Sequence, residues 1–476
     1  MIRGWHNLKA RNLKTTLLRL SGRTEEANAF AQETQKIDPL DWGSGYEIWK
    51  IKCESNLELC DEEYGLHNED QQGIKKQTCS DTADNHNLIE LSLNYKEAGL
   101  YWEAAAVLAL STQENDPMLH YYRYFYTDCK DAMESAERAD SSFCFPNRVE
   151  DIAVLTKAIE QGALHACYYL GCLFYDKGRY EEAITLWERA SEANDMPAAY
   201  RNLSLAYFNK KKDVAKAKAA IETAFTMNTK DVRVLFELDQ FYKVTEVNAK
   251  ERLAHLERYA ELLPLRDNLY TEYITLLNEN EEYEKAYEFM MAHKFHPWEG
   301  GEGKITSQYR IALMAMAQKK AENGEIPLAE ELLQKALVYP ENLGEGKLIG
   351  AMDNDIYYLL GKLQTQKENA YAYFQKAAKC NMEFSSAMYY NDQPPQMAYY
   401  AALAMAEAGN KKEAENVFRN MAAYGEEHMD DEVEIEYFAV SLPDFLVYEA
   451  DLQKKNKLHC KNMIDLGKKG LEIIGK

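Results

Sequence analysis

Two short segments of this chain share a polar pattern 43 residues apart. HPWEGGEGK runs from His296 to Lys304, and YPENLGEGK runs from Tyr339 to Lys347. Glycine permits positive φ and close backbone approach, the acidic and basic side chains offer opposite charges, and a tryptophan offers a flat apolar face. Groups of this kind suit a sugar, a polar peptide or a partner domain.

The two GEGK segments supply all the candidate binding residues. Three interpretations stay open for them: the glycines end helices while the charges cap or bridge neighbouring hairpins, the segments bind a ligand or another domain, or they take part in catalysis. The candidates are His296, Trp298, Glu299, Gly301, Glu302, Gly303, Lys304, Glu345, Gly346 and Lys347.

The GK pair does not form a phosphate-binding loop. Such a loop needs a glycine six residues before its lysine and Ser or Thr after it. Trp298 and Glu341 occupy the first position, and Ile305 and Leu348 occupy the last. The sequence therefore predicts no nucleotide, and no other cofactor is expected.

Groups for acid-base, nucleophilic or metal chemistry do not stand out elsewhere. Glu237, Asp239, Arg266 and Asp267 are interpreted as buried ion pairs between repeats rather than as an acid-base couple. We predict no catalytic residues and no metal ligands, so the chain is not expected to be an enzyme on its own.

Cysteine usage indicates a reducing compartment. The nine cysteines are odd in number, and none is spaced as CxxC, so a disulfide framework is not expected. Cys167 and Cys172 fall on one predicted helix, about 140° apart around its axis, so they cannot jointly bind a metal. Both are interpreted as small buried apolar residues.

The net charge of the chain excludes two classes of partner, and its hydropathy excludes a membrane-spanning location. The net charge of −23 is spread along the chain, which repels phosphate backbones and anionic lipid headgroups, so nucleic acid and membranes are not expected as partners. Basic residues interrupt the first twenty positions, and no apolar run reaches the roughly 18 residues of a membrane span. A cytoplasmic protein is predicted.

The elements that position these residues are helices. Ala, Leu, Glu, Lys and Tyr dominate, and period-two alternation is scarce, which favours an all-α fold. The clearest copy of a tetratricopeptide-type pattern runs from Cys167 to Pro197. In it, small residues let two antiparallel helices approach while large ones fill the groove to the next hairpin. The positions are Leu170, Gly171, Phe174, Gly178, Tyr180, Ala183, Trp187 and Ala190.

Weaker copies occur before and after it at a similar spacing, and together they predict about ten helix pairs in one right-handed superhelix. We expect a first helical hairpin over residues 1–42 and an irregular insertion over 43–82. The repeat array should cover 83–443, and C-terminal capping helices should cover 444–476, since a solenoid end needs a cover.

A closer resemblance covers almost the whole chain. It rests on CFPNRVED from Cys144, RNLSLAYFNK from Arg201, ELDQFYK from Glu237 and SLPDFLVYEADL from Ser441, together with both GEGK segments. These resemble the C-terminal tetratricopeptide-repeat half of large bacterial proteins that carry an N-terminal mutarotase-like β-sandwich domain of unknown function.

The resemblance implies a missing neighbour. The family places a domain similar to carbohydrate-binding sandwiches ahead of the repeats, whereas this chain begins at a repeat without a polar capping hairpin. We expect a fragment, a split gene or the downstream member of a pair. A β-sandwich domain encoded upstream and an oligosaccharide become candidate partners, beside a protein or peptide.

Two functions therefore remain. The first is a non-catalytic scaffold that binds a protein partner or domain through its concave face and its GEGK edge, as helical solenoids usually do. The alternative is the accessory repeat half of a carbohydrate-active enzyme whose β-sandwich domain is absent from this chain.

Overall fold

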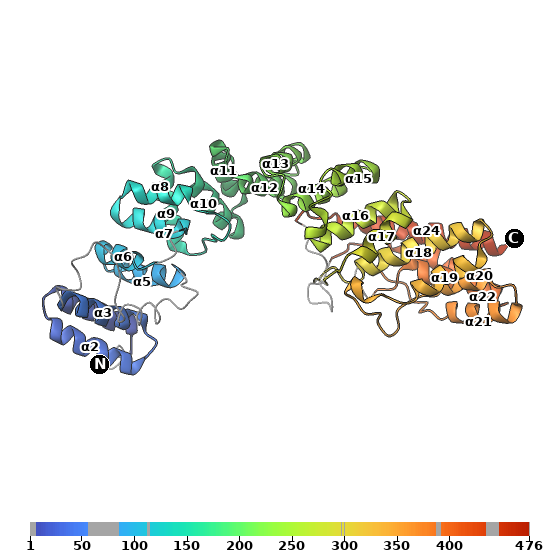
Figure 1. Cartoon of the computed structure of the whole chain (residues 1–476), viewed down its shortest axis with the longest axis horizontal. Coiled ribbons are helices and arrows are strands. Elements are labelled where there is room, and N and C mark those ends of the chain that lie inside the picture. Colours follow the sequence, from blue (N-terminus) through green and yellow to red (C-terminus); the bar gives the residue numbers. More distant parts are fainter. Residues whose placement is uncertain are drawn as a thin grey trace. The chain divides into compact units, whose positions relative to one another are not determined.

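The computed structural model describes residues 6–55, 85–111, 115–296, 298, 300–386, 392–434 and 447–475. Within these ranges every regular element is a helix, and no strand occurs (Figure 1). The predicted all-α fold is confirmed. The chain divides into two compact units, Met1–Leu203 and Ser204–Lys476, and each is described by itself.

The α-helices described in the first unit have 8 to 14 residues. The elements of this unit are α1 (Leu8–Leu20), α2 (Thr24–Ile37), α3 (Trp42–Ser55), α5 (Asn85–Glu97), α6 (Tyr101–Leu108), α7 (Pro117–Thr127), α8 (Lys130–Arg138), α9 (Val149–Glu160), α10 (Leu164–Asp176), α11 (Tyr180–Ala190), the 3-10 helix η2 (Ser191–Ala193) and the start of α12 (Pro197–Ala206).

The second unit continues from the end of α12 through further hairpins to a long final helix. Its elements are the π-helix η3 (Tyr207–Lys211), α13 (Val214–Met227), α14 (Val232–Val244), α15 (Ala249–Glu257), η4 (Leu263–Leu265), α16 (Asp267–Glu279), α17 (Tyr283–Ala292), α18 (Lys304–Glu322), α19 (Ile326–Ala336), η5 (Glu341–Leu343), α20 (Asn354–Leu363), α21 (Lys367–Ala377), α22 (Pro395–Glu407), α23 (Lys411–His428) and α24 (Leu452–Gly475).

The α10/α11 hairpin packs as a tetratricopeptide repeat does. A Cβ on Gly171 would lie 2.5 Å from Nε1 of Trp187, so only glycine admits the indole at this point. Trp187 is 3% exposed, and its Nε1 donates to the Tyr168 carbonyl at 3.1 Å. Ala183 and Ala190 are fully buried. The predicted register of this copy is confirmed.

The same small-to-large contact recurs in the α20/α21 hairpin of the second unit. A Cβ on Gly361 would lie 2.6 Å from Cε1 of Phe374, which is 6% exposed. Close approach of paired helices at a glycine, filled by one aromatic ring, is therefore a property of the repeat and not of a single hairpin.

The stretch expected to be an irregular insertion begins differently in the structure. Residues 43–55 belong to α3, which packs on α1 and α2. Glu47 of α3 is fully buried and accepts hydrogen bonds from Thr16, Arg19 and Tyr95. These contacts between distant residues stabilise a helix whose own sequence contains two glycines. Residues 56–82 lie outside the described residues.

Helix α24 covers the last hairpin. A Cβ on Gly467 would lie 2.6 Å from the Phe418 carbonyl oxygen, so the backbones of α24 and α23 are in direct contact. Cys460 and Met463 are buried in the same contact. The apolar face of α22 and α23 is thereby shielded from water.

None of the described helices combines the length and the apolar content that a membrane-crossing helix requires.

Candidate functional site

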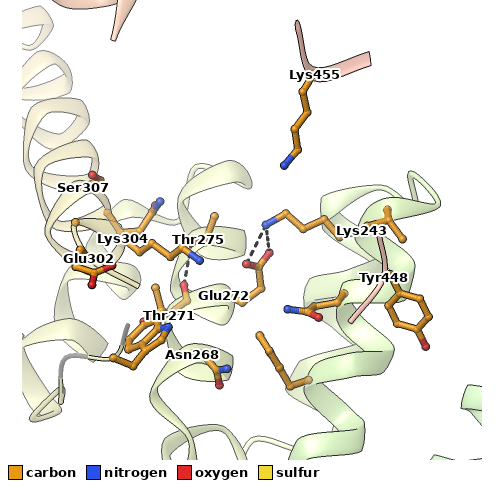
Figure 2. Close-up of a pocket in the computed structure, with 16 residues that line it drawn as sticks. Lys243, Asn268, Thr271, Glu272, Thr275, Glu302, Lys304, Ser307, Tyr448 and Lys455 are labelled. Atoms are coloured by element: carbon orange, nitrogen blue, oxygen red, sulfur yellow. Dashed lines mark hydrogen bonds and ion pairs between the residues drawn. The ribbon is translucent and has the colours of Figure 1, made fainter. Parts of the chain in front are cut away.

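A groove with a volume of about 580 Å³ lies in the second unit, on the first helices of three consecutive hairpins. Helices α14, α16 and α18 form its floor, the first GEGK segment forms one side, and residues near the start of α24 form another (Figure 2). It is lined by Phe236, Gln240, Lys243, Val244, Asn268, Thr271, Glu272, Thr275, Trp298, Glu302, Gly303, Lys304, Ser307, Gln308, Tyr448 and Lys455.

Helical spacing explains why these side chains converge. Each helix contributes positions in an i, i+3, i+4 pattern, which places them on one face. Helix α14 starts at Val232 because the Asp231 carboxylate accepts from the N–H groups of Arg233 and Val234. Helix α18 starts at Lys304, directly after Gly303, whose φ of 74° is accessible to glycine at little cost.

An ion pair joins two of the helices at the centre of the groove. Nζ of Lys243 on α14 lies 2.7 and 2.9 Å from the two carboxylate oxygens of Glu272 on α16 (Figure 2). Beneath them, Arg252 of α15 donates to Glu272 at 2.7 Å and to Asp239 at 2.6 Å. Asp239 forms a buried ion pair, as predicted, but its partner Arg252 lies in the same hairpin and not in a neighbouring repeat.

These partners set the protonation of the buried carboxyls. Burial opposes ionisation of Glu272, but Lys243 and Arg252 outweigh it and hold its pKa below the usual value. Asp239 is more deeply enclosed, and burial raises its pKa to about 6 against the opposing pull of Arg252. The Arg252 guanidinium therefore binds two carboxylates, that of Glu272 in the groove and that of Asp239 beneath it.

The local charge of the groove differs from that of the whole chain. Lys243, Lys304 and Lys455 line it, against Glu272 and Glu302. Figure 2 shows Lys304 and Glu302 on one side, the Lys243–Glu272 pair between, and Lys455 reaching in from the start of α24. In a chain of net charge −23, this surface favours a neutral or acidic ligand.

Three polar atoms of the lining are buried without a hydrogen-bond partner among the described residues. They are Oε1 of Gln240, Oγ1 of Thr271 and Nε1 of Trp298. Gln240 is only 6% exposed, and burying an unpaired polar group costs about 1–3 kcal/mol. A ligand that carries both hydrogen-bond donors and acceptors would recover that cost.

The first GEGK segment folds under its own tryptophan. A Cβ on Gly301 would lie 2.0 Å from Cε2 of Trp298, so the indole rests directly on this glycine. Gly300 and Gly303 both have positive φ, which turns the backbone under the ring. Trp298, Glu302, Gly303 and Lys304 line the groove as a result. Glu299 lies outside the described residues.

Gly301→Ala is expected to move the Trp298 ring while the repeats stay folded. The added methyl group meets an indole side chain rather than backbone, so the ring shifts, and overpacking of this kind costs about 1–3 kcal/mol. ¹⁹F NMR of the 5-fluorotryptophan-labelled chain would report a changed Trp298 resonance, assigned through Trp298→Phe.

Gly346→Ala is the matched control, because a Cβ at Gly346 meets nothing within 4 Å. An unchanged Trp298 resonance in Gly301→Ala, or an equal change in Gly346→Ala, would contradict the packing of the ring on Gly301.

His296 contacts α16 and does not line the groove. Its backbone N–H donates to Asp267 at 2.7 Å, its Nδ1 lies 3.1 Å from the same carboxylate, and its side chain is 77% exposed. His293 also contacts Asp267, at 2.7 Å. These contacts outweigh burial and keep the pKa of Asp267 below its usual value. His296 therefore fastens the segment to α16 and is not among the residues that line the groove.

The second GEGK segment contacts the first but is not its structural equivalent. Glu345 accepts from the Gly303 N–H at 2.9 Å, at the start of α18, where an acidic group is favourable. Burial raises the pKa of Glu345, and this N–H opposes the rise. Lys347 donates to the Leu337 carbonyl and to Asp353, both at 2.7 Å. The second segment supports the first, which lines the groove.

Four of the candidate residues predicted from the sequence line the groove. Most of the residues that line it were not predicted. Gln240, Lys243, Asn268, Glu272 and Tyr448 were not among the candidates. A signal for them existed, because polar residues recur at helical spacing on the first helices of consecutive repeats, where a core-facing position would be apolar. The candidate binding residues of both segments stay a prediction. No group of three or more His, Cys, Asp or Glu side chains that could hold a metal ion occurs in the described part of the chain.

No protein-family model matches the chain. Solved structures similar to it include yeast Tom70, with 11% identity over 98% of this chain and 96% of that one, at a TM-score of 0.28. The C-terminal part of a TPR repeat-containing protein from Cytophaga hutchinsonii has 15% identity over 61% and 93%, at 0.28. A tetratricopeptide repeat protein from Parabacteroides merdae has 16% over 67% and 98%, at 0.24.

Similarities this weak carry no argument about function. The assignment of tetratricopeptide-type hairpins comes from the packing itself, with Gly171 against Trp187 and Gly361 against Phe374.

Proposed function

We propose that this chain is a non-catalytic tetratricopeptide-repeat scaffold that binds an extended polar segment of a partner polypeptide in the groove of α14, α16 and α18. One observation carries the proposal. Three consecutive first helices direct polar side chains into one groove, and the amide oxygen of Gln240 is buried there without a partner among the described residues.

The chemistry of the lining fits an extended peptide. Amide and hydroxyl groups of Gln240, Asn268, Thr275 and Ser307 offer donors and acceptors of the kind that pair with peptide N–H and C=O groups. Trp298 would pack against one apolar side chain of the partner, because a buried aromatic anchor contributes strongly to binding. The lysines would bind acidic side chains of the partner.

The partner itself is proposed from the sequence. The resemblance to proteins with an N-terminal β-sandwich makes a domain encoded upstream one candidate, with a segment of that domain as the groove's ligand. The accessory-half alternative, with an oligosaccharide as ligand, has no contact among the described residues in its favour.

The triple variant W298A/E302A/K304A should remain folded and lose binding. A peptide selected against the wild-type chain from a random-sequence phage library would serve as the probe. We expect its Kd to rise at least about tenfold in the triple variant, measured by calorimetry, since an aromatic anchor and two charged groups are removed.

A control triple on the same helix separates this effect from a general change in charge or helicity. Q318A/K319A/E322A alters exposed positions of α18 outside the groove and should leave Kd unchanged. Equal affinity of the selected peptide for wild type and W298A/E302A/K304A would refute the groove as the binding site. Tight binding of an oligosaccharide panel, with no peptide selected, would favour the alternative.

A further inference from the structure

A short segment near the C-terminus lies in a pocket formed 240 residues earlier in the chain. We call this segment, Val447–Glu449, the strap. It contacts the end of α12, the π-helix η3 and α14, all within the second unit. Tyr448 is completely buried there. Its position borders the groove but lies outside the GEGK segments.

The pocket holds the strap backbone by one side-chain amide. Asn209 Nδ2 donates to the Val447 carbonyl at 2.8 Å, and the Glu449 N–H donates to Asn209 Oδ1 at 2.9 Å. A single amide thus pairs with the C=O and the N–H on either side of Tyr448, as a neighbouring β-strand would. This arrangement recognises extended backbone whatever its side chains.

The tyrosine side chain is recognised at both its ring and its hydroxyl. The ring lies edge-on to Phe208 and Phe241, with centroid distances of 5.3 and 5.2 Å, a favourable aromatic geometry. Ser204 Oγ donates to the Ala217 carbonyl at 2.7 Å. Because that uses its one proton, the Tyr448 hydroxyl must donate to Ser204 Oγ, 2.8 Å away.

The residue after the tyrosine is recognised by charge. Glu449 Oε1 accepts from Lys210 Nζ at 2.7 Å, and its second oxygen lies 3.7 Å from Lys212 Nζ. Lys212 adopts a left-handed φ of 54°, which closes the π-helix that carries Asn209 and Lys210. π-Helical turns are rare and concentrate at functional sites.

We propose that this pocket is a recognition site for an extended peptide segment with a tyrosine followed by a glutamate, and that the strap is its resident occupant in cis. A partner polypeptide that presents the same sequence would compete with the strap for this pocket. The proposal does not depend on the ligand of the groove of α14, α16 and α18, because only Tyr448 is shared and the side chains that hold the strap do not line the groove.

The covalent attachment of the strap predicts how well a free peptide competes for the pocket. A strap joined to the same chain has an effective concentration in the millimolar range, so an untethered peptide of comparable affinity competes poorly. We therefore expect little binding of a free peptide to the wild-type chain and measurable binding once the strap is altered.

The test uses the full chain carrying V447G/Y448S/E449G and a fluorescein-labelled peptide of sequence DFLVYEAD. Fluorescence anisotropy should show saturable binding to the variant, with affinity at least about tenfold above that for the wild type. A peptide with alanine in place of tyrosine should bind at least about tenfold more weakly. The additional change Asn209→Ala should reduce affinity similarly, because it removes both backbone hydrogen bonds.

Two further measurements keep the proposal falsifiable. If the triple strap variant does not fold, Tyr448→Ala replaces it, since its backbone contacts with Asn209 are retained, and the same ratios apply. Exchange of straps between two copies, seen as a dimer by light scattering, would support the pocket and identify a second copy as the partner. Absence of saturable peptide binding to a folded strap variant, or binding that Asn209→Ala leaves unchanged, would overturn the proposal.

Discussion

Trp187→Ala is expected to destabilise the first unit by about 3–5 kcal/mol, the usual cost of deleting a large buried aromatic side chain. Trp187 is 3% exposed and fills the space between α10 and α11 that Gly171 leaves open. Alanine would leave a cavity there and would also remove the hydrogen bond to the Tyr168 carbonyl. Urea denaturation followed by circular dichroism measures the loss as a lower midpoint.

Trp102→Ala provides the matched control, because it removes the same side chain from a site that is 79% exposed. Its midpoint should stay close to the wild-type value. Gly171→Leu should also destabilise the unit, since any side chain there collides with the indole. An unmoved midpoint in Trp187→Ala would show that the assigned register of this hairpin is wrong.

Arg252→Leu should destabilise the second unit by about 3–5 kcal/mol, the typical cost of removing one partner of a buried ion pair. Arg252 is 4% exposed and is bound by two carboxylates, Asp239 and Glu272. Without the guanidinium, Asp239 is left fully enclosed and unpaired, while Glu272 retains Lys243. Thermal unfolding of the two proteins gives the difference directly.

The loss in Arg252→Leu should grow as the pH rises. Burial already raises the pKa of Asp239 to about 6, and removing the cation raises it further. A carboxyl whose pKa is higher in the folded state than in the unfolded state takes up its proton on folding, so stability falls as pH rises through the window between the two values. We expect a larger deficit at pH 8 than at pH 5.

Two control variants isolate the contribution of the Asp239–Arg252 ion pair to stability. Asp239→Leu/Arg252→Leu should be more stable than Arg252→Leu alone, because no charge is left unpaired. Arg179→Leu removes a surface pair with Glu182 in which both side chains are about half exposed and should leave the melting temperature unmoved. A flat pH dependence in Arg252→Leu would argue against an enclosed, unpaired Asp239.

Local sequence was sufficient for the hairpins. Gly171, Ala183, Trp187 and Ala190 have a spacing that admits one packing, since the small residues must face the large one for the helices to close. The pattern is short-range, and the contacts it predicts lie within one hairpin. The all-α fold and the buried Trp187 could therefore be predicted before any coordinates were known.

The prediction of an irregular insertion was wrong for residues 43–55. Residues 43–55 contain two glycines and have a weak helical pattern, yet they form α3. What stabilises that helix is Glu47, held by Thr16, Arg19 and Tyr95 from other helices. Tertiary hydrogen bonds outweighed local propensity, and no window of sequence contains them all.

By itself, the sequence determined that this protein is a helical repeat and that its two GEGK segments are unusual. Only the tertiary structure decided how they differ: Glu345 caps the start of α18, whereas Glu302, at the equivalent position, lines the groove. It also placed Tyr448 against Phe208 and Phe241. The physical reason is that repeat patterns encode contacts between neighbours, while a groove and a strap depend on residues up to 244 positions apart.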